Sequence, residues 1–309
     1  MQASSGRTIG VYDQGKPGPL VYVLGGIHGN EPAGVKALQH VFAKLTASQP
    51  GMQGRFVGVC GNCTALSQQK RFIDRDMNRL WKAEDIRRIS ESDSVLLNSE
   101  EKEMKELLAH LNEELESHEG PHYFIDLHTT SGPRGLFSIV TDRKYNRELA
   151  EVLNVPIIFN LVGALAKTTS VFMDDRNLVG VAFESGQHDD PEAIQLHEAA
   201  IWVLLEKIGC LDATAIQDFA TYQSQLMQAG QSQPPYMRVT YRHPIEPEHQ
   251  FRMEPGYINF QTVSKGELLA YDRNGAIHCP SDGKILMPLY QSQGEDGFFI
   301  VEEIAQPPV

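Results

Sequence analysis

Two residues of types that bind first-row metals stand three positions apart near the start of the chain. His28 and Glu31 follow the apolar run 20–24 (LVYVL) and a Gly-Gly pair. Imidazole nitrogens and carboxylate oxygens are both zinc ligands, and one short turn can aim two such side chains the same way. An H-x-x-E pair is also common as a solvated surface pair, so a metal site here needs a third ligand.

A second histidine, His128, ends the run 123–128 (YFIDLH), which has the length and composition of a buried strand. Asp126 lies two residues earlier, on the same face of that strand. A carboxylate in this position can orient a metal-bound imidazole. His128 is therefore the candidate third ligand, and the alternative is a core histidine that hydrogen-bonds within the protein.

Glu184 stands at the carboxyl end of a further predicted strand, 177–185 (NLVGVAFES). A carboxylate beside an apolar sheet core tends to have a raised pKa, which a general base near neutral pH requires. The alternative is a residue that only caps the exit of the strand. His188, four positions further on, is interpreted as structural.

Residues 71–79 (RFIDRDMNR) carry five charges in nine positions. A run of this kind is ordinarily a solvated loop held by its own ion pairs. Before it, Cys60 and Cys63 form a C-x-x-C pair that could be redox active or half of a zinc site. No second C-x-x-C accompanies the pair, so buried free thiols are the favoured interpretation.

The elements that must position these side chains alternate between strands and helices, as in an α/β domain. Beyond the three strands above, the patterns predict strands over 55–60 and 155–159, and helices after residue 32 and over 98–116 and 191–208. Asn30 is expected to cap the first helix, and Asp190 and Gly209 to bound the last. In open α/β sheets ligands bind at the carboxyl ends of the strands, where the candidate residues stand.

The pattern of predicted secondary structure changes beyond residue 212. Residues 213–235 combine a helical stretch with a linker, and from residue 236 short strands alternate with Pro and Gly turns. We expect the domain that carries the site at 1–212 and a small β-rich domain at 236–309. Tyr290 is the one residue of the small domain nominated to contact a substrate.

The composition is that of an ordinary globular protein, with 40 acidic and 27 basic residues and a net charge of −13. This balance argues against nucleic acid or an anionic membrane surface as the main partner. The start of the chain shows no signal segment, and no run is long and apolar enough to span a bilayer. We therefore expect a cytoplasmic protein, and a homo-oligomer stays among the options.

Taken in order along the chain, these motifs resemble those of the aspartoacylase and succinylglutamate desuccinylase family, relatives of the zinc carboxypeptidases. Four stretches carry the resemblance: GGIHGNEPAG, RFIDRDMNR, IDLHTTSG and VAFESG. The resemblance implies a zinc carboxypeptidase-like fold, a mixed β-sheet flanked by helices, with a small C-terminal β domain.

By position, the resemblance implies one zinc ion per chain, held by His28, Glu31 and His128. It implies Glu184 as the general base and then the general acid. It also implies that Arg71 polarises the scissile carbonyl and stabilises the oxyanion.

The same resemblance implies that Asn78 and Arg79 bind a carboxylate of the substrate. Aspartoacylases are expected to have a further substrate-binding arginine shortly before the catalytic glutamate, and only Arg176 lies near that place. Three protein ligands would leave zinc an open position for a water molecule whose pKa falls to about 7.

The sequence thus predicts a zinc amidohydrolase that deacylates a small anionic N-acyl amino acid, such as N-acetylaspartate or N-succinylglutamate. One alternative is a zinc carboxypeptidase that acts on short peptides with the same metal and the same glutamate. Another is a metal-binding or small-molecule-binding relative without activity.

Overall fold

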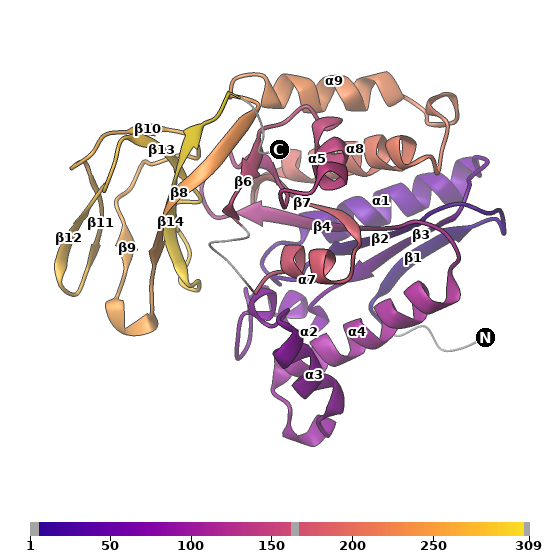
Figure 1. The fold of residues 1–309 in the computed structure, drawn as a ribbon, viewed down its shortest axis with the longest axis horizontal. Coiled ribbons are helices and arrows are strands. Elements are labelled where there is room, and N and C mark those ends of the chain that lie inside the picture. Colours follow the sequence, from indigo (N-terminus) through magenta and orange to yellow (C-terminus); the bar gives the residue numbers. More distant parts are fainter. Residues whose placement is uncertain (1–5, 162–166, 306–309) are drawn as a thin grey trace.

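A computed structural model describes residues 6–161 and 167–305 of the chain. Within these residues, an eleven-stranded mixed sheet carries helices on both faces, and a three-stranded sheet stands at the C-terminal end (Figure 1). The predicted α/β fold, with a mixed sheet flanked by helices and a C-terminal β region, is confirmed.

The strands of both sheets follow one another in chain order as β1 (Thr8–Asp13), β2 (Leu20–Gly25), β3 (Arg55–Cys60), β4 (His122–Thr130), β5 (Leu136–Ile139), β6 (Ile157–Phe159), β7 (Val179–Gln187), β8 (Tyr236–Pro244), β9 (Arg252–Met253), β10 (Thr262–Val263), β11 (Leu268–Asp272), β12 (Gly275–His278), β13 (Gly283–Leu286) and β14 (Asp296–Glu303). In space the large sheet has the order β1-β3-β2-β4-β7-β5-β6-β8-β14-β13-β10, and the small sheet has the order β12-β11-β9. Strands β3, β2, β4 and β7 are parallel, so their carboxyl ends meet at one edge.

The α-helices described are α1 (Ala33–Ser48), α2 (Cys63–Ser67), α3 (Ala83–Glu91), α4 (Ser99–Ser117), α5 (Lys144–Glu151), α7 (Thr169–Asp175), α8 (Pro191–Ile208) and α9 (Phe219–Gly230). Short 3-10 helices are η1 (Met77–Arg79), η2 (Ser94–Leu96), η3 (Ala213–Ala215) and η4 (Pro247–His249). Helices α1, α8 and α9 lie on one side of the large sheet, and α2, α3, α4 and α7 lie on the other (Figure 1).

Strand β2 shows why its sequence is apolar throughout. Val21 and Val23 belong to the core that includes α1 and α8, whereas Leu20, Tyr22 and Leu24 belong to the core that includes α4. Successive side chains of a strand point to opposite faces, and both faces of this strand are covered. A continuous apolar run is therefore required until the chain leaves the sheet after Gly25.

The predicted boundaries of the last helix of the α/β part are confirmed. Asp190 caps α8 by accepting a hydrogen bond from the backbone N–H of Glu192, and Gly209 ends it in a left-handed conformation, with φ of 88°. The predicted cap of the first helix is wrong. Pro32 occupies the N-cap position of α1 without a side-chain hydrogen bond, because Asn30 instead donates from its side chain to Gln291, at 2.6 Å.

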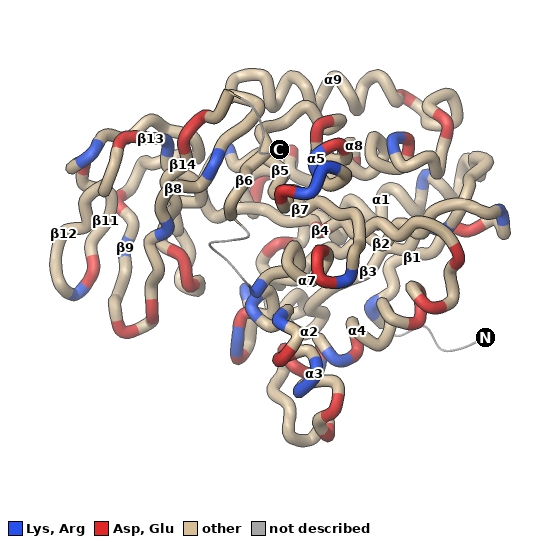
Figure 2. The backbone as a smooth tube through the Cα atoms, viewed as in Figure 1, with Lys and Arg blue, Asp and Glu red and all other residues tan. Residues whose placement is uncertain are grey.

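The C-terminal strands continue the large sheet. β8 pairs with β6 in parallel, and β14, β13 and β10 extend the sheet beyond it. The sheet is thus continuous across residue 236, and the division into domains at 1–212 and 236–309 stays a prediction. Basic and acidic residues are interspersed both in the helical layers and along the C-terminal strands (Figure 2). In the described part of the chain, no helix has both the length and the apolarity to cross a membrane.

Candidate metal centre and its pocket

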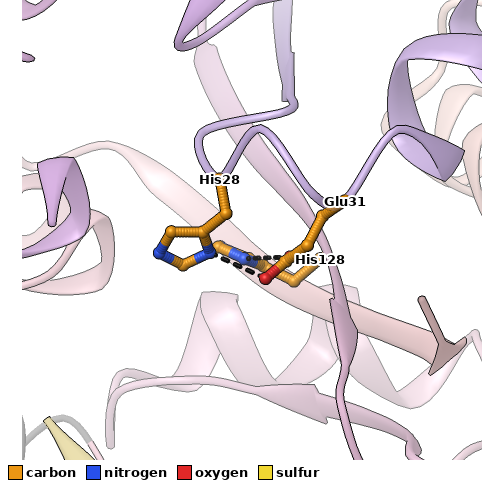
Figure 3. Close-up of side chains that lie close together, drawn as sticks. All are labelled: His28, Glu31 and His128. Carbon is orange, nitrogen blue, oxygen red and sulfur yellow. Dashed lines mark hydrogen bonds and ion pairs between the residues drawn. The ribbon is translucent and has the colours of Figure 1, made fainter. Parts of the chain in front are cut away.

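The structure brings His28, Glu31 and His128 together at the carboxyl edge of the parallel strands (Figure 3). One ligand atom of each residue lies within 4.8 Å of the others, and all three side chains are buried. Glu31 lies between the histidines, with 2.9 Å from His28 Nδ1 to Oε1 and 3.3 Å from His128 Nδ1 to Oε2. The cluster forms because β2 and β4 are neighbours in the sheet, so the turn after β2 faces the end of β4.

The outward-facing nitrogen of each histidine meets a buried carboxylate. His28 Nε2 lies 3.1 Å from Asp76 Oδ1, and His128 Nε2 lies 2.8 Å from Asp126 Oδ2. With a metal ion bound, these contacts would hold a proton on each Nε2 and direct the lone pair of each Nδ1 toward the metal. His28 Nδ1 is buried, and its one polar neighbour among the described residues is Glu31 Oε1. The three inward atoms are therefore a donor set that could hold a metal ion.

The opposite charges of the cluster stabilise one another. Burial opposes ionisation of Glu31, but the two histidines hold its pKa well below the usual range. Burial likewise opposes the charged form of His128, but Asp126, Glu31 and Glu184 hold its pKa well above the usual range. A cation bound between these groups would take the place of the positive charge on His128.

Asp76 joins the charged segment 71–79 to the cluster. Its Oδ1 accepts from the backbone N–H of Asn78 at 2.8 Å and faces His28, while its Oδ2 accepts from Arg71 at 3.0 Å. The segment is not the solvated loop that its composition suggests, because Asp76, Asn78 and Arg79 are all buried. Its charges are directed inward, toward the cluster.

Glu184 lies beside His128 on the neighbouring strand. The two residues are directly paired in the register of β4 and β7. The Glu184 side chain is buried, and its Oε2 has no hydrogen-bond partner. Burial raises the pKa of Glu184 to about 8; the charges of Glu31 and Asp126 add to this shift, and those of His128 and Arg71 oppose it. The upward direction agrees with the expectation for a carboxylate at the end of a buried strand.

A pocket opens over the cluster, and its lining includes Arg71, Asn78 and Arg79. Arg71 donates to Glu31 at 3.3 Å as well as to Asp76, and its Nε has no hydrogen-bond partner. The side-chain oxygen of Asn78 accepts from the backbone N–H of Thr169 at 3.1 Å.

Arg79 connects the pocket to the C-terminal strands. It donates to Asp296 at 2.6 Å, and its Nε lies 3.4 Å from a Glu295 oxygen. Burial disfavours the charged guanidinium, but Asp76, Asp296 and Glu295 hold its pKa above the usual value. The candidate carboxylate-binding arginine therefore already faces two carboxylates of the protein.

Tyr290 and Arg176 are not among the described residues that line this pocket. The Tyr290 hydroxyl donates to the Glu254 carbonyl and accepts from the Tyr257 backbone N–H, both at 2.9 Å. Arg176 ends α7, and its guanidinium lies 5.3 Å above the ring of Phe172. Substrate contact by Tyr290 stays a prediction.

His188 lines the pocket, although the sequence led us to interpret it as structural. Its Nδ1 lies 2.8 Å from the Thr129 hydroxyl, and its Nε2 lies 3.2 Å from the Gln291 side-chain oxygen. That oxygen also accepts from Asn30. His188 lies four positions after Glu184, and this spacing is a signal that could have been used. No sequence pattern points to Gln291, more than a hundred positions further along.

The fold and the site define an α/β protein with a candidate metal centre at the carboxyl edge of its sheet. The model of the succinylglutamate desuccinylase/aspartoacylase catalytic domain matches residues 17–200. The chain belongs to the succinylglutamate desuccinylase/aspartoacylase family. The matched residues include both histidines, Glu31 and Glu184.

Individual relatives agree with this family. A succinylglutamate desuccinylase from Pseudoalteromonas atlantica is 23% identical over 290 residues, which are 88% of this chain and 77% of the relative. A succinylglutamate desuccinylase/aspartoacylase structure from Rhodobacter sphaeroides superposes with a TM-score of 0.65 at 17% identity, over 95% of this chain and 88% of that one. The structure of murine aminoacylase 3 superposes with a TM-score of 0.60 at 17% identity, over 94% of this chain and 96% of that one. The two structures share the fold with this chain.

Proposed function

We propose that this chain is a zinc-dependent amidohydrolase that removes the acyl group from a small N-acyl amino acid. The observation that carries the proposal is the buried cluster of His28, Glu31 and His128, with Glu184 beside it on the floor of a pocket. Family membership supports amide hydrolysis of the desuccinylase and aspartoacylase kind. The names of the relatives, desuccinylase and aminoacylase, support an N-acyl amino acid as the substrate class.

The residues of the cluster fit zinc. Two imidazoles and one carboxylate are a common protein ligand set of catalytic zinc sites, which keep a further position open. The buried Nδ1 of His28, which faces Glu31, and the carboxylates behind both histidines support the same assignment. When bound, zinc would polarise a carbonyl group and lower the pKa of a water molecule.

Glu184 is the proposed general base. Its unpartnered Oε2 would accept the proton of the attacking water and then deliver it to the nitrogen of the leaving amino acid. The apolar surroundings that raise its pKa also make the carboxylate a better proton acceptor once it is ionised. One residue would thus serve both halves of the reaction.

Arg71 is the proposed oxyanion stabiliser. Two of its nitrogens donate to Glu31 and Asp76, which hold the guanidinium beside the cluster. Its Nε is buried without a hydrogen-bond partner, and it is the proposed donor to a carbonyl oxygen that develops negative charge. Asn78 and Arg79, at the end of the segment 71–79, are the proposed contacts to a substrate carboxylate. Tyr290 is a proposed further contact to the substrate.

A substrate panel tests the proposed function. The zinc-loaded protein is incubated with a set of N-acetyl and N-succinyl amino acids and with short peptides, and the released acid and amino acid are measured. Release of the acyl group as free acid is the expected result. Release of free C-terminal amino acids from peptides would identify a carboxypeptidase instead, and a metal-loaded protein inert on both panels would indicate a binding protein.

A further inference from the structure

The positive charges of the pocket are largely engaged by the protein itself. Arg71 and Arg79 are the only lysine or arginine residues among the described residues that line it. Arg71 is held by Glu31 and Asp76, and Arg79 is held by Asp296. The five residues between Leu161 and Lys167 carry no charged side chain. A substrate with two or three carboxylates would therefore meet few free cations.

The wall above Arg79 is acidic. Glu295 and Asp296 both line the pocket, at the start of β14. Both oxygens of Asp296 are engaged, because one accepts from Arg79 and the other accepts from Arg242 at 2.5 Å. The Glu295 side chain is 45% exposed and makes only a 3.4 Å ion-pair contact with Arg79 Nε. Glu295 thus presents to the pocket a half-exposed negative charge that a single long ion pair holds.

The contact between Arg79 and Glu295 can be exchanged for contacts with a ligand. The Arg79 side chain is 8% exposed, and its Nε makes no hydrogen bond, only the 3.4 Å contact with Glu295. A carboxylate of the substrate that accepts from this N–H would displace Glu295 from it. The displaced Glu295 side chain would then be free to pair with a cationic group of the same substrate.

The rest of the described lining contains no lysine or arginine. It combines neutral hydroxyl groups with the apolar side chains of Ile139, Leu161, Ala182, Met287, Leu289 and Phe299. A charged acyl group would lose its hydration against the apolar side chains and would gain no further opposite charge from this part of the lining. The lining therefore favours an uncharged acyl group.

We propose that this pocket selects an N-acyl amino acid with an uncharged acyl group and a side chain that ends in a cationic amine, and that Glu295 recognises the amine. The proposal rests on the proposed function and deepens it. The substrate is anionic only at its α-carboxylate. An acidic side chain in the same place would face the like charges of Glu295 and Asp296, which disfavours binding.

The test compares three acetylated amino acids with matched side chains. Nα-acetyllysine carries the amine, N-acetylnorleucine has a similar chain without it, and N-acetylglutamate has a negative charge. We measure kcat/KM with the zinc-loaded wild type and Glu295→Gln. The wild type is expected to prefer the lysine derivative over the norleucine derivative by about five-fold, the size of a partly exposed ion pair, with the glutamate derivative last. In Glu295→Gln the preference for lysine is expected to fall to near one.

The matched control is Glu303→Gln, which removes a charge from an exposed position at the far end of β14. It is expected to leave the ratio unchanged. A wild type that prefers the glutamate derivative would overturn the proposal, and so would a lysine preference that survives in Glu295→Gln.

Calorimetry with the same three compounds separates this proposal from the proposed function. If the wild type hydrolyses no N-acyl amino acid, the proposed function fails, and the dissociation constants then decide the charge preference of the pocket. Tighter binding of the lysine derivative, lost in Glu295→Gln, would support the role of Glu295. Tighter binding of the glutamate derivative, or no binding of any compound, would overturn it.

Discussion

Two walls of the pocket differ in how they are built. The metal wall, formed by His28, Glu31 and His128, stands on the ends of parallel strands, and each of these residues is at most 5% exposed. The arm wall, formed by residues 287–296 between β13 and β14, comes from the C-terminal strands and includes the half-exposed Glu295. The chemistry is proposed to reside in the first wall and the selection of substrate in the second.

This difference indicates which part of the site tolerates substitution and which part does not. The metal wall is fixed by buried carboxylates behind both histidines, so a change there leaves an unpaired buried charge, which is costly. The arm wall reaches the pocket through contacts such as Arg79 to Asp296 and Asn30 to Gln291. Glu295 makes no hydrogen bond or ion pair with His28, Glu31 or His128, so its side chain can change without disturbing the metal wall.

Glu184→Gln should have the largest effect on turnover. The amide cannot accept a proton, so kcat is expected to fall by about 10²- to 10⁴-fold, the usual contribution of a general base. Zinc content should stay the same, because Glu184 is not one of the three proposed ligands. Steady-state kinetics and metal analysis check both points, with Glu192→Gln, in the first turn of α8, as the control. Turnover within a few-fold of wild type would contradict the assigned role.

Arg71→Ala should have the second largest effect on turnover. Loss of one donor to a developing oxyanion typically costs about 10²- to 10³-fold in kcat. The loss should appear mainly in kcat, because the carbonyl gains negative charge only in the transition state. Arg75→Ala removes an arginine of the same segment that does not line the pocket and serves as the control. An effect confined to KM would instead make Arg71 a binding residue.

Arg79→Lys should have a smaller effect, on binding. Lysine cannot reproduce the planar fork that donates to Asp296 and Asn78 while offering Nε to a substrate carboxylate. KM is expected to rise roughly ten-fold, the loss of one charged hydrogen bond, with zinc content unchanged. Kinetics on the preferred substrate from the panel provide the measurement. An unchanged KM would refute carboxylate binding by Arg79.

The pH dependence of stability should show the smallest effect. In the metal-free protein Glu184 has a pKa raised from 4.5 to about 8, so the folded state holds a proton that the unfolded state releases. The contribution of Glu184 to the free energy of unfolding is fully present below pH 4.5, the pKa in the unfolded chain. It is lost as the pH rises from 4.5 to about 8, by at most about 1.4 kcal/mol per pH unit. Urea unfolding at several pH values should give a flatter profile for Glu184→Gln. Identical slopes would show that Glu184 is ionised in the folded protein.

The metal wall was largely predictable from sequence because its residues are tied to local patterns. His28 and Glu31 share one turn after an apolar strand, and His128 and Glu184 each stand near the end of a predicted strand. Parallel strands then bring these ends to one edge. Asp126 was predictable for the same reason, since it shares a strand face with His128.

The arm wall was not predictable, because it depends on how the C-terminal strands join the sheet. The pairing of β8 with β6 places Glu295 and Asp296 over Arg79, more than two hundred residues earlier in the chain. No periodicity or spacing encodes such a contact. Asn30 illustrates the same limit, since its bond to Gln291 overrode its local preference for a helix cap.

The proposed zinc site is tested most directly by the metal content of purified wild type and His128→Ala after zinc is added back and excess is removed. His122→Ala, at the opposite end of the same strand, is the matched control. We predict about one zinc per chain in wild type and control, and loss of both zinc and hydrolase activity in His128→Ala. Wild type that takes up no zinc, or His128→Ala that keeps it, would contradict the assignment of the metal centre.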